Sequence, residues 1–198
     1  MDGRIETPAR YLVAGLGNPG VRYAATRHNI GFRVVAALAG SAAIQLHCGN
    51  RDIRWGRGRI SGKEVILAQP LAYMNRCGPP IRLLMEEQQI GREALFVIHD
   101  DLDLAFGRFK IKEKGGDGGH RGIRSLIDAL GNGDFGRLRI GIGRPASDIE
   151  IVDYVLGDFF PDEARTLNAI IDHACEAVTT VLTAGIRTAM NRFNMREP

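Results

Sequence analysis

The chain has 198 residues, of which 44% are hydrophobic and 25% charged, which suits one folded domain and excludes a largely disordered protein. Its net charge of +3 is too small to identify an anionic partner by itself. The three cysteines are far apart and odd in number, which argues against a disulfide framework or a cysteine-based zinc site and favours a reducing compartment.

No secretory signal is visible at the start of the sequence, and no apolar run approaches the roughly 20 residues of a membrane helix. We therefore expect a cytoplasmic protein without a membrane partner. Nothing in the sequence requires more than a monomer.

Apolar periodicity and turn residues predict strands that alternate with helices. The expected strands cover residues 11–16, 51–60, 64–68, 95–99, 106–112 and 137–142. The expected helices cover residues 29–39, 79–88, 123–130 and 161–182, the last with a long apolar stripe. This order predicts a single α/β domain over residues 1–198, with a flexible segment at 1–9. Its sheet should be twisted and mixed, mostly parallel, and flanked by helices.

Gly15, Gly17 and Gly20 follow the first expected strand at the spacing of a dinucleotide-binding loop. Two observations oppose that function. Pro19 removes an amide that a pyrophosphate would use, and no acidic residue occurs between Gly20 and Asp52, where a ribose-binding carboxylate is needed. We therefore expect no cofactor, and we expect the glycines to shape a pocket at the carboxyl end of the strand.

Polar clusters also follow later strands, and ligands of open α/β sheets bind at the carboxyl ends of strands. These positions predict one pocket that contains Asn18, His28, Asn75, Asp100 and His120.

Several long motifs then match one family in order. The segments GLGNPGVRYAATRHNIG, PLAYMN, HDDLDL, KGGDGGHRGIRSL and RLRIGIGRP resemble those of bacterial-type peptidyl-tRNA hydrolases, and YVLGDF fits the last third of that family. The resemblance covers about residues 11–191. It implies a cofactor-free enzyme that hydrolyses the ester between a peptide and the 3′ end of tRNA, so peptidyl-tRNA is the expected partner. A non-enzymatic RNA-binding protein on the same fold is the alternative.

The resemblance also implies roles for individual residues. His28 is the expected catalytic residue, and Asp100 is the carboxylate that orients it. The substrate-binding residues that it implies are Asn18, Tyr23, Met74, Asn75 and His120, and we expect Tyr73 and Arg121 to lie beside them. The tRNA-binding residues that it implies are Lys112 and Arg139, and we expect Lys110, on the same face of the basic strand as Lys112, to bind with them. Tyr73 and Met74 fit a hydrophobic core equally well.

Arg121 departs from the family, which usually has asparagine at this position. The carbonyl function of that asparagine does not carry over, since arginine has donors and a fixed charge but no acceptor. Its guanidinium offers hydrogen bonds to a phosphate or to carbonyls of the peptide.

The residue types suit hydrolysis by water. A neutral histidine accepts a proton near pH 7, and a carboxylate on its other nitrogen fixes the tautomer. We expect an amide N–H of Asn75 to hold the developing oxyanion. Ser125 and Cys77 have no evident activating partner, so we expect direct attack by water.

Residues 104–144 contain nine Lys and Arg residues against four acidic residues, which concentrates the positive charge of the chain there. Such a segment predicts salt-sensitive binding to phosphates. We also expect an anion site at the glycine loop 115–119 and the start of the helix that follows. A metal-dependent phosphohydrolase with Asp100, Asp101, Asp103 and histidines as ligands is a further alternative. It is opposed by spacing, because adjacent residues of an extended segment face opposite sides.

Overall fold

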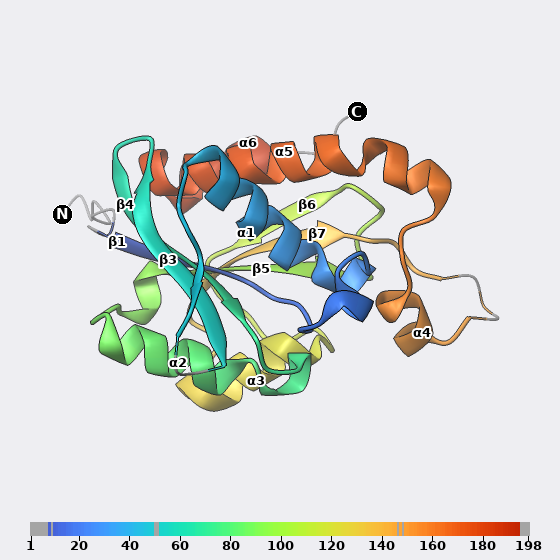
Figure 1. Cartoon of the computed structure of the whole chain (residues 1–198). Coiled ribbons are helices and arrows are strands. Elements are labelled where there is room, and N and C mark those ends of the chain that lie inside the picture. Colours follow the sequence, from blue (N-terminus) through green and yellow to red (C-terminus); the bar gives the residue numbers. More distant parts are fainter. Residues whose placement is uncertain (1–7, 9, 50–51, 146, 148, 195–198) are drawn as a thin grey trace.

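The computed structural model describes residues 8, 10–49, 52–145, 147 and 149–194, and the structural statements below concern these residues. They form one seven-stranded sheet with helices on both faces (Figure 1). The flexible segment predicted at 1–9 falls outside the described residues, apart from residue 8, and so does residue 51 of the second predicted strand.

The strands are β1 (Arg10–Gly15), β2 (His47–Cys48), β3 (Ile53–Ile60), β4 (Lys63–Pro70), β5 (Leu95–Asp101), β6 (Phe109–Lys112) and β7 (Gly136–Gly141). The helices are α1 (Ile30–Ser41), α2 (Gly78–Glu87), α3 (Arg121–Leu130), α4 (Ile151–Leu156), α5 (Pro161–Ala184) and α6 (Ile186–Phe193). Short 3₁₀ helices are η1 (Val21–Tyr23), η2 (Arg27–Asn29), η3 (Met74–Arg76) and η4 (Arg92–Ala94).

Every predicted strand and helix is present, with shifted ends. The largest shift is at residues 106–112, where the strand begins only at Phe109. Gly107 has a φ of 78°, and the amide of Arg108 bonds to the carbonyl of Ala105, so this part of the chain turns. The sequence did not predict β2, α4 or α6.

The strand order is β2-β3-β4-β1-β5-β7-β6. The four central strands, β4, β1, β5 and β7, are parallel, whereas β2, β3 and β6 pair antiparallel at the two edges. This confirms a mixed sheet with a parallel centre. Because parallel strands end at the same edge, β1, β4, β5 and β7 bring the segments that follow them together.

Helices α1, α5 and α6 cover one face of the sheet, and α2 and α3 cover the other (Figure 1). Each face has its own core. Val13, Ile98 and Val178 belong to the first core, and Leu12, Val97 and Leu126 belong to the second. Consecutive residues of β1 and β5 thus point to opposite faces, and both are buried, as expected for central parallel strands.

The early glycines bring β1 close to α1. A Cβ atom on Gly15 would lie 2.1 Å from the carbonyl oxygen of Gly31, and one on Gly17 would lie 2.7 Å from the ring of Phe32. Gly20 has a φ of 101°, and α1 begins only at Ile30, after η1 and η2. The glycines therefore permit close packing and a turn, and the helix does not open on the glycine loop as a dinucleotide site requires.

In the described part of the chain, no helix combines the length and the hydrophobicity that a membrane span needs.

Candidate active site

A cleft of about 840 Å³ lies at the carboxyl ends of the central strands. Nearly all of the candidate residues line it. They are Asn18, Tyr23, His28, Tyr73, Met74, Asn75, Asp100, Lys112, His120, Arg121 and Arg139. Lys110 is the exception, because it is exposed on β6 and is not among the residues that line the cleft.

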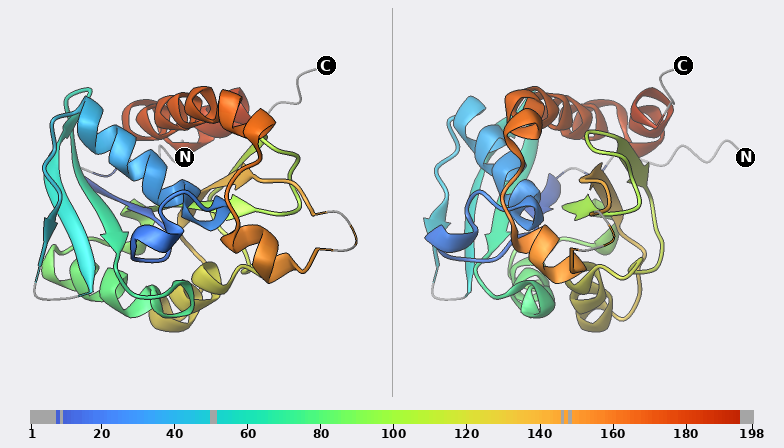
Figure 2. Two further views of the ribbon diagram at one scale, coloured as in Figure 1. Left: turned by 45° about the vertical axis from the view of Figure 1, so that its right-hand side comes forward. Right: turned by 90° about the vertical axis from the view of Figure 1, so that its right-hand side faces the viewer.

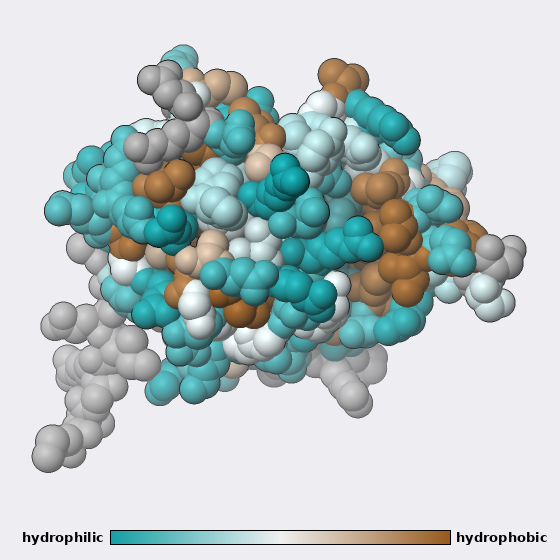
Figure 3. All heavy atoms as spheres, turned by 90° about the horizontal axis from the view of Figure 1, so that it is seen from below, coloured by the Kyte–Doolittle hydropathy of each residue, from teal (hydrophilic) through white to brown (hydrophobic). Residues whose placement is uncertain are grey.

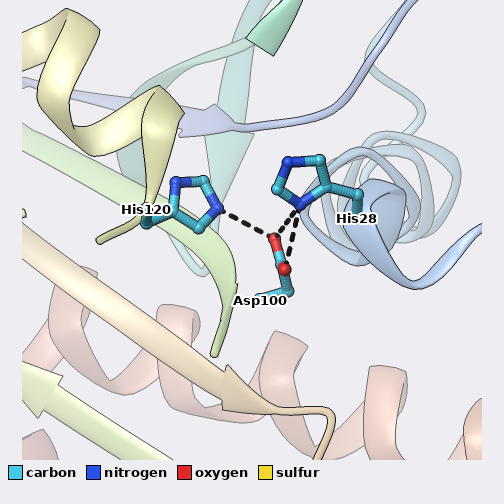
Figure 4. Close-up of side chains that lie close together, drawn as sticks. All are labelled: His28, Asp100 and His120. Atoms are coloured by element: carbon cyan, nitrogen blue, oxygen red, sulfur yellow. Dashed lines mark hydrogen bonds and ion pairs between the residues drawn. The ribbon is translucent and has the colours of Figure 1, made fainter. Parts of the chain in front are cut away.

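Asp100 lies between two histidines at the base of this site (Figure 4). His28 Nδ1 is 2.9 Å from each carboxylate oxygen, and His120 Nε2 is 2.9 Å from Oδ1. The three residues come from η2, from β5 and from the residue before α3. Asp100 is 2% exposed and His28 is 9% exposed, so the contacts are largely shielded from water.

The hydrogen bonds of His120 fix its tautomer. Its Nδ1 accepts the backbone N–H groups of Gly122 at 3.1 Å and Ile123 at 3.2 Å, as the N-cap of α3. Nδ1 therefore carries no proton, and Nε2–H donates to Asp100. The anion site expected at the start of α3 is wrong for these two amides, because the His120 side chain already satisfies them.

The charge of Asp100 is stabilised from both sides. Burial alone would raise its pKa, but His28 and His120, by charge and by hydrogen bonding, hold the pKa well below the ordinary value. Burial lowers the pKa of His28, and the charge of Asp100 and its hydrogen bond outweigh this, so the net pKa of His28 is raised. A neutral His28 that donates from Nδ1 has its free lone pair on Nε2.

His99 lies beside this centre as a neutral residue. Its Nδ1 is 2.7 Å from the Asp100 carbonyl, and its ring centroid is 4.6 Å from that of His120. Burial and the neighbouring His120 hold its pKa well below the ordinary value, despite the opposing effect of Asp100.

One ligand atom each from His28, Asp100 and His120 lie within 4.8 Å of one another, and two imidazoles and a carboxylate are a donor set that transition metals bind. The bonding of His120 opposes this use, because a nitrogen that binds a metal must be deprotonated. Asp101 pairs with Arg139, and Asp103 pairs with Arg144. The acidic run is therefore not gathered around one ion.

The Asn18 amide is oriented by the backbone. Its Oδ1 accepts the N–H of Met74 at 2.8 Å, which leaves Nδ2 as the group that can donate. Asn29 holds the Asn18 backbone through bonds of 2.8 and 2.9 Å. Tyr73 is 59% exposed, so a core position for it is wrong, whereas Met74 is buried in the second core and also lines the cleft.

The basic segment is partly neutralised by its own neighbours. Arg139 pairs with Asp101, and Arg124 pairs with Asp117. Arg137 is 2% exposed and donates to the carbonyls of Gly115, Gly116 and Gly133. Arg137 therefore holds the glycine loop by hydrogen bonds from the interior of the protein, a role that the sequence did not reveal. These bonds and its burial make it unavailable to a phosphate.

The sequence also missed the wall that α4 contributes. Ile151 and Val152 line the cleft and are each 47% exposed. From below, a band of apolar side chains lies on the same side of the molecule as α4 (Figure 3). A six-residue helix gives little periodicity, so only the presence of adjacent apolar residues hinted at it.

Neither candidate nucleophile is activated. The Ser125 hydroxyl accepts the N–H of Gly78 at 3.0 Å and lies under α2. Burial raises the pKa of the Cys77 thiol to about 12, so it carries no thiolate at neutral pH.

Comparison with known proteins gives a consistent result. The family model described as peptidyl-tRNA hydrolase matches residues 12–198. A Bacillus subtilis peptidyl-tRNA hydrolase is 44% identical over 185 residues, covering 93% of this chain and 98% of the relative, and one from Chloroflexus aurantiacus is 45% identical with the same coverage. The crystal structure of peptidyl-tRNA hydrolase from Acinetobacter baumannii has a TM-score of 0.90 at 38% identity and covers 98% of both chains.

The matching family model and relatives define the class as a hydrolase of mixed α/β fold, and the histidine–carboxylate cluster lies in its cleft. Within that class, the chain belongs to the peptidyl-tRNA hydrolase family.

Proposed function

We propose that this protein hydrolyses the ester bond of peptidyl-tRNA, with His28 activating water and Asp100 orienting His28. The observation that carries the proposal is the pair of 2.9 Å contacts from His28 Nδ1 to the Asp100 carboxylate, at the base of a large cleft. The relatives that match nearly the whole chain are named peptidyl-tRNA hydrolase.

In this mechanism Nε2 of His28 accepts a proton from water as the water oxygen attacks the ester carbonyl carbon. The carbonyl oxygen takes up the negative charge of the tetrahedral intermediate. When the intermediate collapses, the bond to the 3′ oxygen of the tRNA breaks, and His28 returns its proton to that oxygen. The products are a peptide with a free carboxylate and a tRNA with a free 3′ hydroxyl.

Two asparagines are suited to hold the reacting ester. The Asn18 Nδ2 donor faces a cleft that Asn75 also lines, and a preorganised donor at the oxyanion contributes about 3–4 kcal/mol to such reactions. His120 uses both ring nitrogens within the protein, so we assign it a positioning role for Asp100.

The tRNA and the peptide use different sides of the cleft in this proposal. Lys112 and Arg139 bind phosphates of the tRNA, and Lys110 adds positive charge farther out on β6. Tyr23, Tyr73 and Met74 contact the substrate near the ester. The side chain of Arg121 is exposed, forms no hydrogen bond or ion pair with a described residue, and offers its donors to the peptide or a phosphate.

We further propose that the enzyme acts in the cytoplasm, as a single-domain monomer and without a cofactor. All of the proposed residues belong to one chain, so the site needs no second copy. Cys48, Cys77 and Cys175 are free thiols, in keeping with a reducing compartment.

The test is release of tRNA from an N-acetyl-aminoacyl-tRNA in the presence of EDTA, for wild type, His28→Ala and His47→Ala. His47 is exposed on β2 and provides the matched control. We expect wild type and His47→Ala to turn over equally, and His28→Ala to be slower by about 10²–10⁴-fold with tRNA affinity retained. Wild-type protein that binds the acylated tRNA without hydrolysing its ester would support an RNA-binding protein instead. Hydrolysis that depends on added metal would support the metal-dependent alternative.

A further inference from the structure

Arg27 precedes His28 in η2, and its side chain is buried although it carries a full charge. Its exposed fraction is 1%, and it is the largest fully buried side chain among the described residues. A buried guanidinium is costly unless it is paired and hydrogen-bonded, so its surroundings need a specific explanation.

The guanidinium lies in a site built from the segment that joins α4 to α5. Nη2 donates to Glu163 at 2.6 Å, and Nη1 donates to the carbonyl of Asp158 at 2.5 Å. The rings of Tyr154 and Phe160 lie 4.2 and 4.4 Å from its central carbon. Charge, hydrogen bonds from Nη1 and Nη2 and aromatic faces thus hold the guanidinium in one enclosed position. Its Nε is also buried and has no hydrogen-bond partner among the described residues.

Backbone contacts tie the same two segments together. The amide of Arg27 donates to the carbonyl of Gly157 at 3.0 Å, and Thr26 forms an isolated antiparallel bridge with Asp158. Glu163 also accepts the N–H of Phe160 at 2.7 Å, which links the start of α5 to the same cluster. In Figure 2, the blue segment that carries η2 lies against the orange segment around α4.

His28 needs such support because a 3₁₀ helix of three residues has little internal bonding. The residues on its two sides are both anchored. Arg27 is held by the α4–α5 segment, and Asn29 is held by the Asn18 backbone. The direction in which the His28 ring points is therefore set by these two neighbours and by Asp100.

We infer that Arg27 is a positioning residue for the reaction, because its side chain pins η2 to the α4–α5 segment and so holds His28 Nδ1 against Asp100. The inference rests on the proposed function of His28 as the base. The segment that Arg27 contacts also includes α4, which lines the cleft through Val155 and Leu156. Arg27 therefore holds both this wall of the cleft and the proposed general base, His28.

The test compares Arg27→Met, Arg27→Lys and Glu163→Gln with wild type. A displacement of about 1 Å in a catalytic group typically costs about 10²-fold in rate, so we expect kcat of Arg27→Met to fall by about that factor with KM little changed. Arg27→Lys keeps the charge and should recover part of the loss. Glu163→Gln keeps an acceptor for the Phe160 N–H, and its kcat should lie between those of wild type and Arg27→Met.

Val181→Ala is the control for a general loss of stability. Val181 is fully buried where α5 packs on the sheet, in the first core, and is not among the residues that line the cleft. We expect Val181→Ala to lower the melting temperature while kcat of the folded protein stays normal. Circular dichroism at the assay temperature identifies the folded fraction of each variant.

An NMR titration of the His28 ring gives a readout that does not depend on turnover. The charged and titratable groups around His28 are Asp100, His120 and Arg121, which none of these substitutions changes. If Arg27 positions His28, the titration midpoint in Arg27→Met should move from its raised value toward that of a free histidine.

An unchanged midpoint, or a kcat loss no larger than the loss of folded protein, would overturn the inference. Wild-type protein that does not turn over substrate would refute the proposed function instead. A shifted midpoint in that case would still establish Arg27 as the anchor of the His28 ring.

Discussion

Asp100→Asn exchanges a carboxylate for an amide of nearly the same shape, which removes a negative charge and replaces one acceptor by a donor at the centre of the cleft. In the wild type, Asp100 accepts hydrogen bonds from His28 and from His120. His120 must remain a donor, because its other nitrogen caps α3. The oxygen of the introduced amide would therefore face His120, and its NH₂ group would lie near His28 Nδ1.

The oxygen that the NH₂ group replaces is 2.9 Å from His28 Nδ1, so two donors would meet there, and the oxygen that remains, also 2.9 Å from Nδ1, would be shared with His120. His28 can relieve this contact by moving its proton to Nε2, the nitrogen that should accept a proton from water. In a Ser-His-Asp triad the same exchange lowers kcat by about 10⁴-fold, or about 5 kcal/mol, through the wrong tautomer. We expect a loss of similar size here.

Single-turnover hydrolysis of N-acetyl-aminoacyl-tRNA measures this loss, and filter binding of the tRNA measures affinity separately. Asp172→Asn, on the exposed face of α5, makes the same chemical change far along the chain and serves as the control. We expect normal kcat for the control and nearly unchanged tRNA affinity for both variants. A kcat of Asp100→Asn close to wild type would refute the tautomer argument.

Three further outcomes test other parts of the structure. Lys112→Ala combined with Arg139→Ala should raise KM and flatten the dependence of log KM on log salt by about 0.9 for each charge that had contacted a phosphate, and an unchanged slope would remove both residues from the tRNA site. The pKa of His28 is raised, and only its neutral ring can accept a proton. The value of kcat/KM should therefore fall with decreasing pH, with a midpoint above the pKa of free histidine. A midpoint below that pKa would contradict the contact with Asp100. Gly15→Ala should lower the free energy of unfolding, measured in urea, by about 1–3 kcal/mol because its Cβ would meet the α1 backbone. In the control Gly40→Ala the new Cβ meets no atom, and the free energy of unfolding should rise by about 0.5–1 kcal/mol. Equal effects of the two substitutions would show that the close packing at Gly15 does not matter.

The sequence predicted the main strands and helices because their apolar residues follow clear periods. It also predicted that Asn18, His28, Asn75 and Asp100 lie in one pocket, because the carboxyl ends of parallel strands meet at one edge of the sheet. The edge strand β2 has two residues, and the helices α4 and α6 have six and eight residues, which is too short for a clear hydrophobic period.

The parts that the sequence did not predict are mostly contacts made by polar side chains. Because arginines are rarely buried, the sequence placed Arg27 in a polar loop and Arg137 on a basic surface. In the structure both side chains are buried and donate hydrogen bonds to backbone carbonyls. The cap that His120 provides to α3 was also missed, because histidine is not a common N-cap residue. Such roles depend on residues far away in the sequence, as in the bond between Arg27 and Glu163.

The order of the strands decides when the proposed catalytic centre can form during synthesis. β5 carries Asp100 and lies between β1 and β7, and η2 is anchored by Gly157 and Glu163, which come late in the chain. A ribosome must therefore release most of the polypeptide before these groups meet. If His28 and Asp100 act as proposed, a copy of this protein that ends before Glu163 and is still esterified to its own tRNA cannot hydrolyse that ester. Its release then depends on an enzyme molecule completed earlier.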